Sequence, residues 1–372
     1  MTKRNGLWNY PVDDGLVLCR SDVNGLFLLN QSARWVWNES QRGTLREEMI
    51  STFAAHFGIS SEIARRDVEA TLASWDEALL APAHSRQAND VGLHPELSQI
   101  SVTDWPEVRA IDCTVNGRPL RVFLELGDVW DEIAPRLQPL RTNGETPPEH
   151  TFTVGCAGDS VLVLRDGICI AKEETAAVAR VILLQALVSL GEPAAILHAG
   201  GCGGILLAGH THSGKSTLCA ALMARGLPFH CEDSAVLDRD FRFAPMPFPL
   251  MLRHGSWPVL EARFPELKDA PVYQRFGVDV RFLTPVQPSG PATVTALVFV
   301  EHDAAAETQI TEVSVFDSLL ELQRSGFWVE HTREGIERFL GWLARIRRYK
   351  LIYAELEQAE GFILELSDPP RP

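Results

Sequence analysis

GILLAGHTHSGKSTLCAALMAR, residues 204–225, is the stretch that decides the fold of most of this chain. Residues 204–208 have the apolar pattern of a buried strand, and residues 218–225 have that of a helix. The sequence between them fits G-x-x-x-x-G-K-[ST], a phosphate-binding loop in the strand-to-helix context that this motif requires. The predicted nucleotide-binding residues are Gly209, His210, Thr211, His212, Ser213, Gly214, Lys215, Ser216 and Thr217.

The residue types of this loop suit a nucleoside triphosphate. Glycines let the backbone curl so that N–H groups point at phosphate oxygens, and the helix N-terminus adds its positive dipole end. Lys215 is expected to reach the β- and γ-phosphates, and the Ser216 hydroxyl is expected to reach Mg²⁺. The alternative is a purely structural glycine turn.

Polar residues flank the loop on both sides. His198 ends an apolar run before it and is expected near the γ-phosphate as a catalytic residue whose charge can switch. Glu232 and Asp233 end the strand expected after its helix and are the other candidate catalytic residues beside Lys215. One carboxylate of such a pair suits Mg²⁺, and the other suits a proton taken from an acceptor hydroxyl. Arg253 is a further candidate for contact with a phosphate. The alternatives are a core histidine, a solvated acidic turn and a surface arginine.

Composition limits the function classes. The chain has 372 residues, enough for two or three domains, and 45% are hydrophobic, enough to bury a core. The net charge of −15 argues against broad binding to nucleic acid or to an anionic membrane. The longest apolar stretch, residues 178–190, is too short to span a bilayer. Seven scattered cysteines without C-x-x-C spacing indicate reduced thiols and a cytoplasmic location.

The first part of the chain reads as a separate small domain, residues 1–82. Two short strands, residues 15–20 and 25–30, form a predicted hairpin, and a helix is predicted over residues 31–39. Thr44 and Glu47 have capping-box spacing at the start of a second helix that runs to about residue 57. Ser60 or Ser61 is predicted to cap a third helix. Residues 83–94 are polar and lack periodicity, so they are predicted to be a linker.

The rest of the chain, residues 95–372, reads as one mixed α/β domain. Its β-rich part, residues 95–190, carries predicted strands at residues 109–115, 120–126, 151–154 and 160–165, then a helix at 173–190. The phosphate-loop core, residues 191–372, carries a predicted strand at residues 294–300 and helices at 314–324 and 333–346. Residues 238–291 are rich in proline and predicted to be irregular.

Three motifs of this core resemble those of HPr kinase/phosphorylase: Leu197-His198-Ala199, the phosphate loop, and Glu232-Asp233 within residues 230–236. The resemblance implies a phosphoenolpyruvate-carboxykinase-like fold with a mixed sheet, and phosphate transfer from a nucleotide to a protein serine. It implies that Lys215 binds phosphate, that Ser216 and Asp233 serve Mg²⁺, and that one residue of the acidic pair is the base. The family usually has Asp where this chain has Glu232, and its C-terminal phosphorylase signature is absent from residues 271–290.

Residues 8–80 resemble PqqD-like domains, through Leu29–Trp37, Gly43-Thr44-Leu45 and Asp67-Val68. This implies a winged-helix-like domain that binds the leader of a ribosomally made precursor peptide as a strand on its sheet edge, residues 25–30. The expected peptide contacts are Phe27, Leu28, Leu29, Val68, Leu72 and Trp75. Core packing is the alternative for each of them. The acidic third helix argues against DNA binding.

Together the two resemblances imply a kinase that uses Mg²⁺ and ATP or GTP to phosphorylate a Ser or Thr of a captured precursor peptide. One alternative is a nucleotide-dependent chaperone or scaffold without catalysis. Another is a kinase of a folded carrier protein or a small molecule. The HPr kinase resemblance also leaves a homo-oligomer open.

Overall fold

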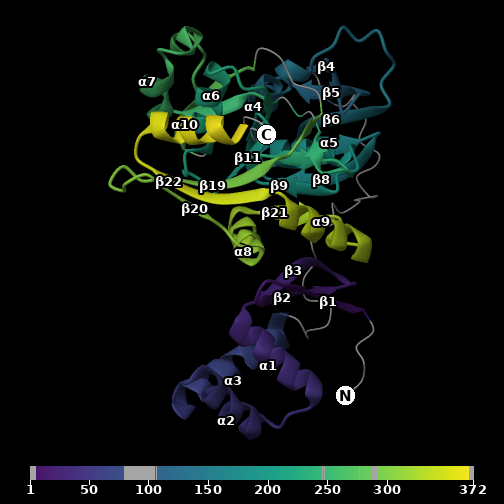
Figure 1. Ribbon diagram of the computed structural model, residues 1–372. Helices are drawn as coiled ribbons and strands as arrows, with labels where there is room; N and C mark the ends of the chain where they lie inside the picture. Colours follow the sequence, from purple (N-terminus) through teal and green to yellow (C-terminus); the bar gives the residue numbers. More distant parts are fainter. Residues whose placement is uncertain are drawn as a thin grey trace. The chain divides into compact units, whose positions relative to one another are not determined.

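The computed structural model describes residues 6–78, 105, 107–244, 246, 248–275, 277–285 and 291–367 (Figure 1). The chain divides into two compact units. The first is built on residues 1–90 with 314–320 and 331–338, and the second contains the remainder. The predicted linker, residues 83–94, lies outside the described residues.

The first unit is a three-stranded antiparallel sheet followed by three helices. The strands β1 (Leu7–Val12), β2 (Gly15–Arg20) and β3 (Val23–Leu29) lie in the order β1-β2-β3. The predicted hairpin is therefore β2–β3, and β1 is a strand that the sequence analysis missed. Its helices are α1 (Gln31–Arg42), α2 (Arg46–Phe57) and α3 (Ser61–Ala78). Their apolar faces bury a common core with β2, in which the rings of Trp37 and Trp75 meet edge to face at 5.4 Å.

The helix caps of this unit correct one prediction. The Asn30 side chain accepts from the N–H of Ala33 at the start of α1 (2.9 Å). The predicted capping box at α2 is wrong, because Leu45 holds the N-cap position without a side-chain bond. Thr44 instead donates its hydroxyl to Glu39 (2.7 Å), which ties it to the end of α1.

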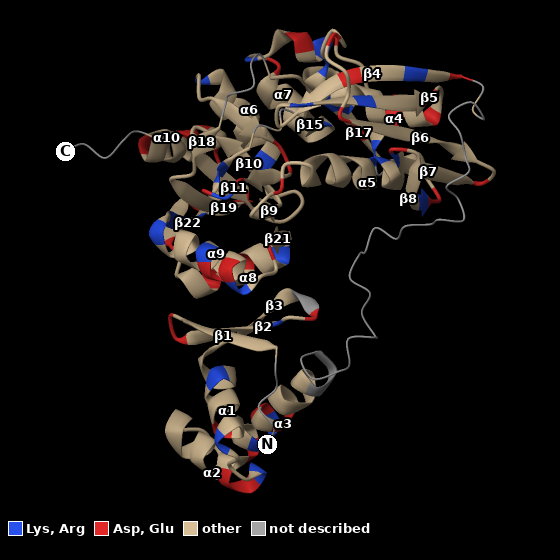
Figure 2. Cartoon of the chain, turned by 90° about the vertical axis from the view of Figure 1, so that its right-hand side faces the viewer, with Lys and Arg blue, Asp and Glu red and all other residues tan. Residues whose placement is uncertain are grey.

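Charges on α3 do not form a basic face. Its arginines are paired with acids on the same helix or on α2: Arg65 with Glu47 at 2.6 Å, and Arg66 with Asp67 at 3.0 Å. Figure 2 shows basic and acidic residues side by side along this helix. Such a surface lacks the clustered positive charge that a DNA-recognition helix presents to phosphates.

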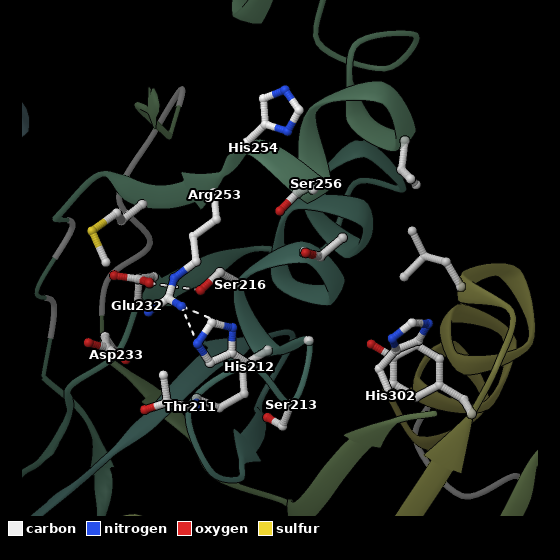
Figure 3. A pocket seen from close by; sticks show the side chains of 18 of the residues that line it. Thr211, His212, Ser213, Ser216, Glu232, Asp233, Arg253, His254, Ser256 and His302 are labelled. Atoms are coloured by element: carbon white, nitrogen blue, oxygen red, sulfur yellow. Dashed lines mark hydrogen bonds between the residues drawn. The ribbon is translucent and has the colours of Figure 1, made fainter. Parts of the chain in front are cut away.

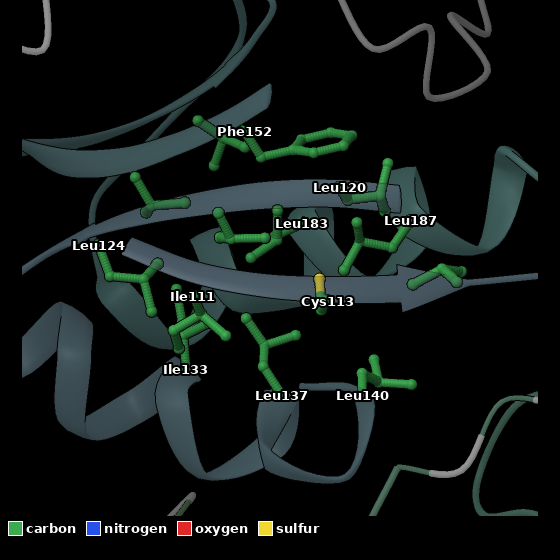
Figure 4. Packing of buried hydrophobic residues seen from close by; sticks show 14 of the residues in the cluster. Ile111, Cys113, Leu120, Leu124, Ile133, Leu137, Leu140, Phe152, Leu183 and Leu187 are labelled. Carbon is green, nitrogen blue, oxygen red and sulfur yellow. The ribbon is translucent and has the colours of Figure 1, made fainter. Parts of the chain in front are cut away.

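The second unit begins with a sheet in the order β4-β5-β6-β7-β8. Its elements are β4 (Val108–Val115), β5 (Arg118–Glu125), α4 (Asp128–Leu137), β6 (His150–Ala157), β7 (Ser160–Arg165), β8 (Ile168–Glu173) and α5 (Ala176–Ser189). The four predicted strands are present, whereas α4 and β8 were not predicted. Both helices pack on the sheet, with Ile133 and Leu137 of α4 and Leu183 of α5 fully buried (Figure 4).

The rest of this unit contains two larger sheets and one small one. One has the order β12-β10-β11-β19-β22-β20, with β11, β19 and β22 parallel and the other pairs antiparallel. Its strands are β10 (Ala199–Cys202), β11 (Ile205–Ala208), β12 (Phe229–Cys231), β19 (Ala296–His302), β20 (Gln309–Glu312) and β22 (Arg347–Tyr353). The mixed sheet that was expected is therefore present. Residues 205–208 of β11 and 296–300 of β19 are buried, which explains their unbroken apolar runs.

The other sheet has the order β18-β14-β13-β9-β21 and is antiparallel throughout. Its strands are β9 (Ala195–Leu197), β13 (Ala235–Leu237), β14 (Arg242–Phe243), β18 (Ala292–Thr293) and β21 (Phe327–Val329). The helices of this part of the chain are α6 (Lys215–Ala224), α7 (Trp257–Leu260), α8 (Val315–Ser325), α9 (Arg333–Arg345) and α10 (Leu356–Ser367). Residues 315–320 of α8 and 333–338 of α9 belong to the first unit.

The proline-rich region that was predicted to be irregular contains a small sheet. The strands β15 (Leu250–Arg253), β16 (Tyr273–Arg275) and β17 (Val278–Leu283) lie in the order β15-β17-β16. They place Arg253 and Asp279 beside the phosphate loop. Among the described residues, none of the helices is apolar over the length needed to cross a membrane.

Candidate functional site

The phosphate loop joins the end of β11 to the start of α6. Gly209 and Gly214 have φ values of 149° and 92°, a region that favours glycine. A Cβ on Gly209 would lie 2.6 Å from the Val300 carbonyl oxygen, and one on Gly214 would lie 2.3 Å from the Tyr353 hydroxyl. Both glycines are therefore required by backbone conformation and by space.

Lys215 is held inside the loop. Its Nζ donates to the carbonyl oxygens of Gly209 (2.7 Å) and His210 (3.1 Å). Burial lowers the pKa of this ammonium, and the carboxylates of Asp233 and Glu232 oppose that shift. The ammonium is thus preorganised over the loop and can exchange two carbonyl oxygens for the more negative oxygens of a phosphate.

Glu232 is a buried carboxylate that faces the first turn of α6. The Ser216 hydroxyl donates to its Oε1 at 2.9 Å, and Arg136 Nη1 lies 3.5 Å from its Oε2. Burial raises the pKa of Glu232 to about 7, with a further contribution from the charge of Asp233 and opposition from Arg136. The hydroxyl that was predicted to serve a metal therefore contacts Glu232, not Asp233.

Asp233 turns away from Glu232 and towards a different partner. It has a left-handed backbone, with φ of 61°, so the two neighbouring carboxylates point in different directions. Its Oδ1 lies 3.4 Å from Nε2 of His198, and its side chain is 43% exposed. Burial lowers the pKa of His198, which the Asp233 charge partly offsets. Asp233 is the more accessible of the two acids.

These residues line one cleft of about 1020 Å³ (Figure 3). Arg253 reaches into it from β15, with Nη1 3.0 Å from Nδ1 of His212. The cleft wall includes every predicted catalytic residue and all predicted nucleotide-binding residues except Gly209 and His210. Those two lie behind it and contribute the carbonyl oxygens that hold Lys215.

The oxygen atoms of Ser216 and Glu232 form the pair best suited to a magnesium ion. Mg²⁺ bound with a nucleotide takes few protein oxygens, because phosphates and waters complete its octahedral coordination. Among the described residues, no three His, Cys, Asp or Glu side chains converge as a metal site. Two protein oxygens leave room for the phosphate and water ligands that a nucleotide-bound Mg²⁺ would bring.

Arg136, from α4 in the β-rich part, was not among the predicted site residues. Arg136 is 5% exposed, donates to the carbonyl of Pro249 (3.3 Å) and lies over the ring of Phe282. Beside it, Glu132 pairs with Arg180 at 2.8 Å and with Arg275 at 2.6 Å. A buried charge network thus stands behind Glu232. An arginine on an unpredicted helix offered no signal for this role.

The predicted peptide contacts of the first unit divide into two groups. Leu29, Val68 and Trp75 are buried in its core, so in this structure they do not form a groove wall. Phe27, Leu28 and Leu72 are half-buried. Strand β3 lies at one edge of the sheet, where the sequence placed the peptide-binding edge, and β1 forms the other edge.

Comparison with known families finds one match in this unit. Residues 15–80 match the family model of Coenzyme PQQ synthesis protein D (PqqD). Residues 15–80 form a PqqD-like domain. The PqqD-like domain comprises β2, β3 and the three helices, and its match stops short of the phosphate loop. Comparison with curated proteins and with solved structures gave no match.

Proposed function

We propose that this chain is a Mg²⁺-dependent kinase that transfers the γ-phosphate of ATP or GTP to a Ser or Thr hydroxyl of a ribosomally made precursor peptide. The observation that carries the proposal is the division of two adjacent carboxylates in one cleft. Glu232 is bonded to the phosphate-loop Ser216, whereas Asp233 lies beside His198. One carboxylate is thus available for a metal and the other for an acceptor.

The phosphate loop binds the triphosphate. Its N–H groups and the α6 N-terminus stabilise phosphate charge, and Lys215 donates to the β- and γ-phosphates. Arg253 stands at the same cleft and supplies a second cation for charge on the transferred group. The HPr kinase resemblance supports the assignment of Lys215 as a phosphate-binding residue.

Glu232 and Ser216 would hold Mg²⁺, which neutralises charge on the β- and γ-phosphates when bound. This differs from the resemblance, which assigned the metal to Ser216 and Asp233. The Ser216–Glu232 hydrogen bond favours the new assignment, because it places both oxygens on the same side of the loop. The Arg136 guanidinium favours the ionised form of Glu232 that a metal requires.

Asp233 is the proposed general base. Its partly exposed carboxylate accepts the proton of the acceptor hydroxyl as that oxygen bonds to the γ-phosphorus and the bond from the γ-phosphorus to the β,γ-bridging oxygen breaks. The nucleoside diphosphate leaves with that oxygen. His198 orients Asp233 through the 3.4 Å contact.

The PqqD-like domain is the reason for proposing a peptide acceptor. Captured by this domain, a leader would raise the effective concentration of its own core segment at the cleft. The half-buried Phe27 and Leu28 on edge strand β3 are the best-placed side chains for contact with an added strand.

The test is the intact mass of short peptides encoded by open reading frames next to this gene. Each is incubated with the full chain, Mg²⁺ and ATP or GTP, with Lys215→Ala and Asp233→Asn as controls. One added phosphate that is lost in both variants supports the proposal. Tight binding of peptide and nucleotide without any phosphate gain would instead identify a scaffold, and the kinase proposal would be abandoned.

A further inference from the structure

Strand β21 is the outer strand of the sheet that carries His198. It pairs antiparallel with β9, in the register Phe327 to Leu197 and Val329 to Ala195. Figure 1 shows the two strands side by side in the second unit. Because the sheet order ends at β21, only one side of this strand is paired.

Hydrogen bonds show which backbone groups face outward. The N–H of His198 donates to the carbonyl of Gly326 (2.9 Å), and the N–H of Glu330 donates to the carbonyl of Ala194 (2.9 Å). Antiparallel pairs alternate between bonded and non-bonded positions, so residues 326, 328 and 330 turn their backbones towards β9. Phe327 and Val329 therefore turn their N–H and C=O groups to the open side.

The open side lacks partners within the part of the chain that the structure describes. No hydrogen bond there joins the outward groups of Phe327 or Val329 to another described residue. Two donors and two acceptors are thus spaced two residues apart, which is the pattern that an extended backbone completes. Trp328 lies between these two residues and is 41% exposed.

This edge begins one strand away from His198, a residue that lines the cleft. Gly326, the residue before β21, accepts the backbone bond from His198, and a Cβ on it would lie 3.8 Å from the His198 Cβ. His198 in turn contacts Asp233, the proposed base. An added strand would lie about 4.8 Å beyond β21. Because the sheet order is β13-β9-β21, the added strand lies about 10 Å from β9 and about 14 Å from β13, the strand that Asp233 precedes. A chain that continues past Gly326 for about three or four extended residues therefore spans the distance to the His198–Asp233 pair.

We propose that the acceptor segment of the peptide substrate binds as an added strand on the open edge of β21, and that the residues beyond the paired positions bring its hydroxyl to Asp233. The inference rests on the proposed function and specifies how the acceptor binds. It assigns a second peptide site, separate from edge strand β3 of the PqqD-like domain.

The chemistry of the edge defines its occupant. Backbone bonds to Phe327 and Val329 require an extended segment whose N–H groups are free at two positions two residues apart, so proline is excluded there. The exposed Trp328 ring favours an apolar or aromatic side chain on the same face of the added strand. The occupant is therefore an extended Ser- or Thr-containing segment, not a preformed helix.

The experiment compares Val329→Pro with Val329→Ala. Proline removes the outward N–H and places its ring on the open edge, and it leaves the bonds of residues 326, 328 and 330 to β9 in place. Alanine keeps the N–H and controls for lost packing. The probe is the peptide that gains phosphate in the mass assay, and fluorescent mant-ATP reports the phosphate loop separately.

We expect Val329→Pro to raise the KM for the peptide at least about tenfold, with mant-ATP affinity within twofold of the natural chain, whereas Val329→Ala changes the peptide KM by less than about threefold. An unchanged peptide KM in a Val329→Pro protein that binds mant-ATP overturns the inference but leaves the kinase proposal intact. If the natural chain transfers no phosphate, both the kinase proposal and the inference about β21 are overturned.

A second measurement decides the matter if Val329→Pro does not fold. The same peptide is synthesised with single N-methyl groups along its acceptor segment and tested with the natural chain. Strand addition predicts that two positions, two residues apart, lose about tenfold or more in kcat/KM while the position between them does not. A flat profile, or losses at consecutive positions, overturns the inference.

Discussion

The Ser216 hydroxyl donates to Oε1 of Glu232 at 2.9 Å, and this bond separates the roles of two neighbouring carboxylates. Glu232 is 4% exposed and closed in by Ser216 and Arg136. Asp233 is reached from the cleft, and within the described part of the chain only His198 lies at ion-pair distance from it. The left-handed backbone of Asp233 produces this difference, because it turns consecutive side chains towards different walls.

The first prediction concerns this division of roles. Glu232→Gln removes a charge beside the Mg²⁺ position, so Mg²⁺-dependent nucleotide affinity should fall at least about tenfold. Asp233→Asn should leave that affinity within about threefold and lower phosphate transfer by roughly a hundredfold or more, the contribution of a general base. Mant-ATP titrations with and without Mg²⁺, beside phosphopeptide mass, measure both. If Asp233→Asn instead lowers the Mg²⁺-dependent nucleotide affinity and Glu232→Gln does not, Asp233 is the metal-binding residue.

The second prediction concerns pH and the stability of the chain without metal. Burial and Asp233 raise the pKa of Glu232 to about 7 in the folded state, from an ordinary value of 4.5. At pH values below 4.5, the Glu232 carboxyl is protonated in both the folded and the unfolded state, so its ionisation does not change the stability. As pH rises towards the higher value, ionisation is resisted only in the folded state, so stability falls.

The natural chain should therefore lose roughly 3 kcal/mol relative to Glu232→Gln between pH 5 and pH 8. Urea unfolding in EDTA at several pH values measures the difference. Glu307→Gln, at an exposed position, is the matched control and should give a constant difference. If the difference in unfolding free energy between the natural chain and Glu232→Gln is also constant with pH, Glu232 ionises as freely in the folded chain as in the unfolded one.

Local sequence was sufficient wherever one strand or helix carries its own pattern. The strand–loop–helix unit of β11 and α6, the four strands β4 to β7 and the three helices of the first unit were predicted from periodicity and turn residues. The candidate site was recognisable because its phosphate loop is contiguous, and because His198, Glu232 and Asp233 lie at the ends of strands next to it.

What the sequence did not show depends on contacts between distant segments. Arg136 and Glu232 are separated by 96 positions, and nothing near Arg136 indicates that α4 buries it against the cleft. The strands β15, β16 and β17 are only three to six residues long, too short for a clear period among prolines. Thr44 formed a plausible cap by spacing, but α2 begins one residue later, with Leu45 at the N-cap, and the Thr44 hydroxyl donates to Glu39 instead.

The third prediction tests the buried Arg136–Glu232 pair. Arg136→Met leaves Glu232 without its cationic partner, so the free energy of unfolding at pH 8 should fall by about 3 kcal/mol. Arg121→Met is the matched control, because Arg121 pairs with Asp112 at 2.7 Å in a partly exposed position and should cost less than about 1 kcal/mol. Urea unfolding measures both.

The double variant Arg136→Met/Glu232→Gln separates charge from packing. It should regain more than about 1 kcal/mol over Arg136→Met, since no buried carboxylate remains unpaired. Simple addition of the two single effects would mean that the loss comes from the contacts of Arg136 with Phe282 and Pro249 alone.

The last prediction concerns Gly214, where two causes exclude a side chain. Its φ of 92° strains any L residue, and an added Cβ would lie 2.3 Å from the Tyr353 hydroxyl. Gly214→Ala should therefore lower both stability and mant-ATP affinity, the former by about 2 kcal/mol or more. Tyr353→Phe removes the nearest atom but not the backbone strain, so Gly214→Ala/Tyr353→Phe should recover only part of the loss. Complete recovery in thermal unfolding would show that the clash alone excludes a side chain, and no recovery would assign the whole cost to the backbone.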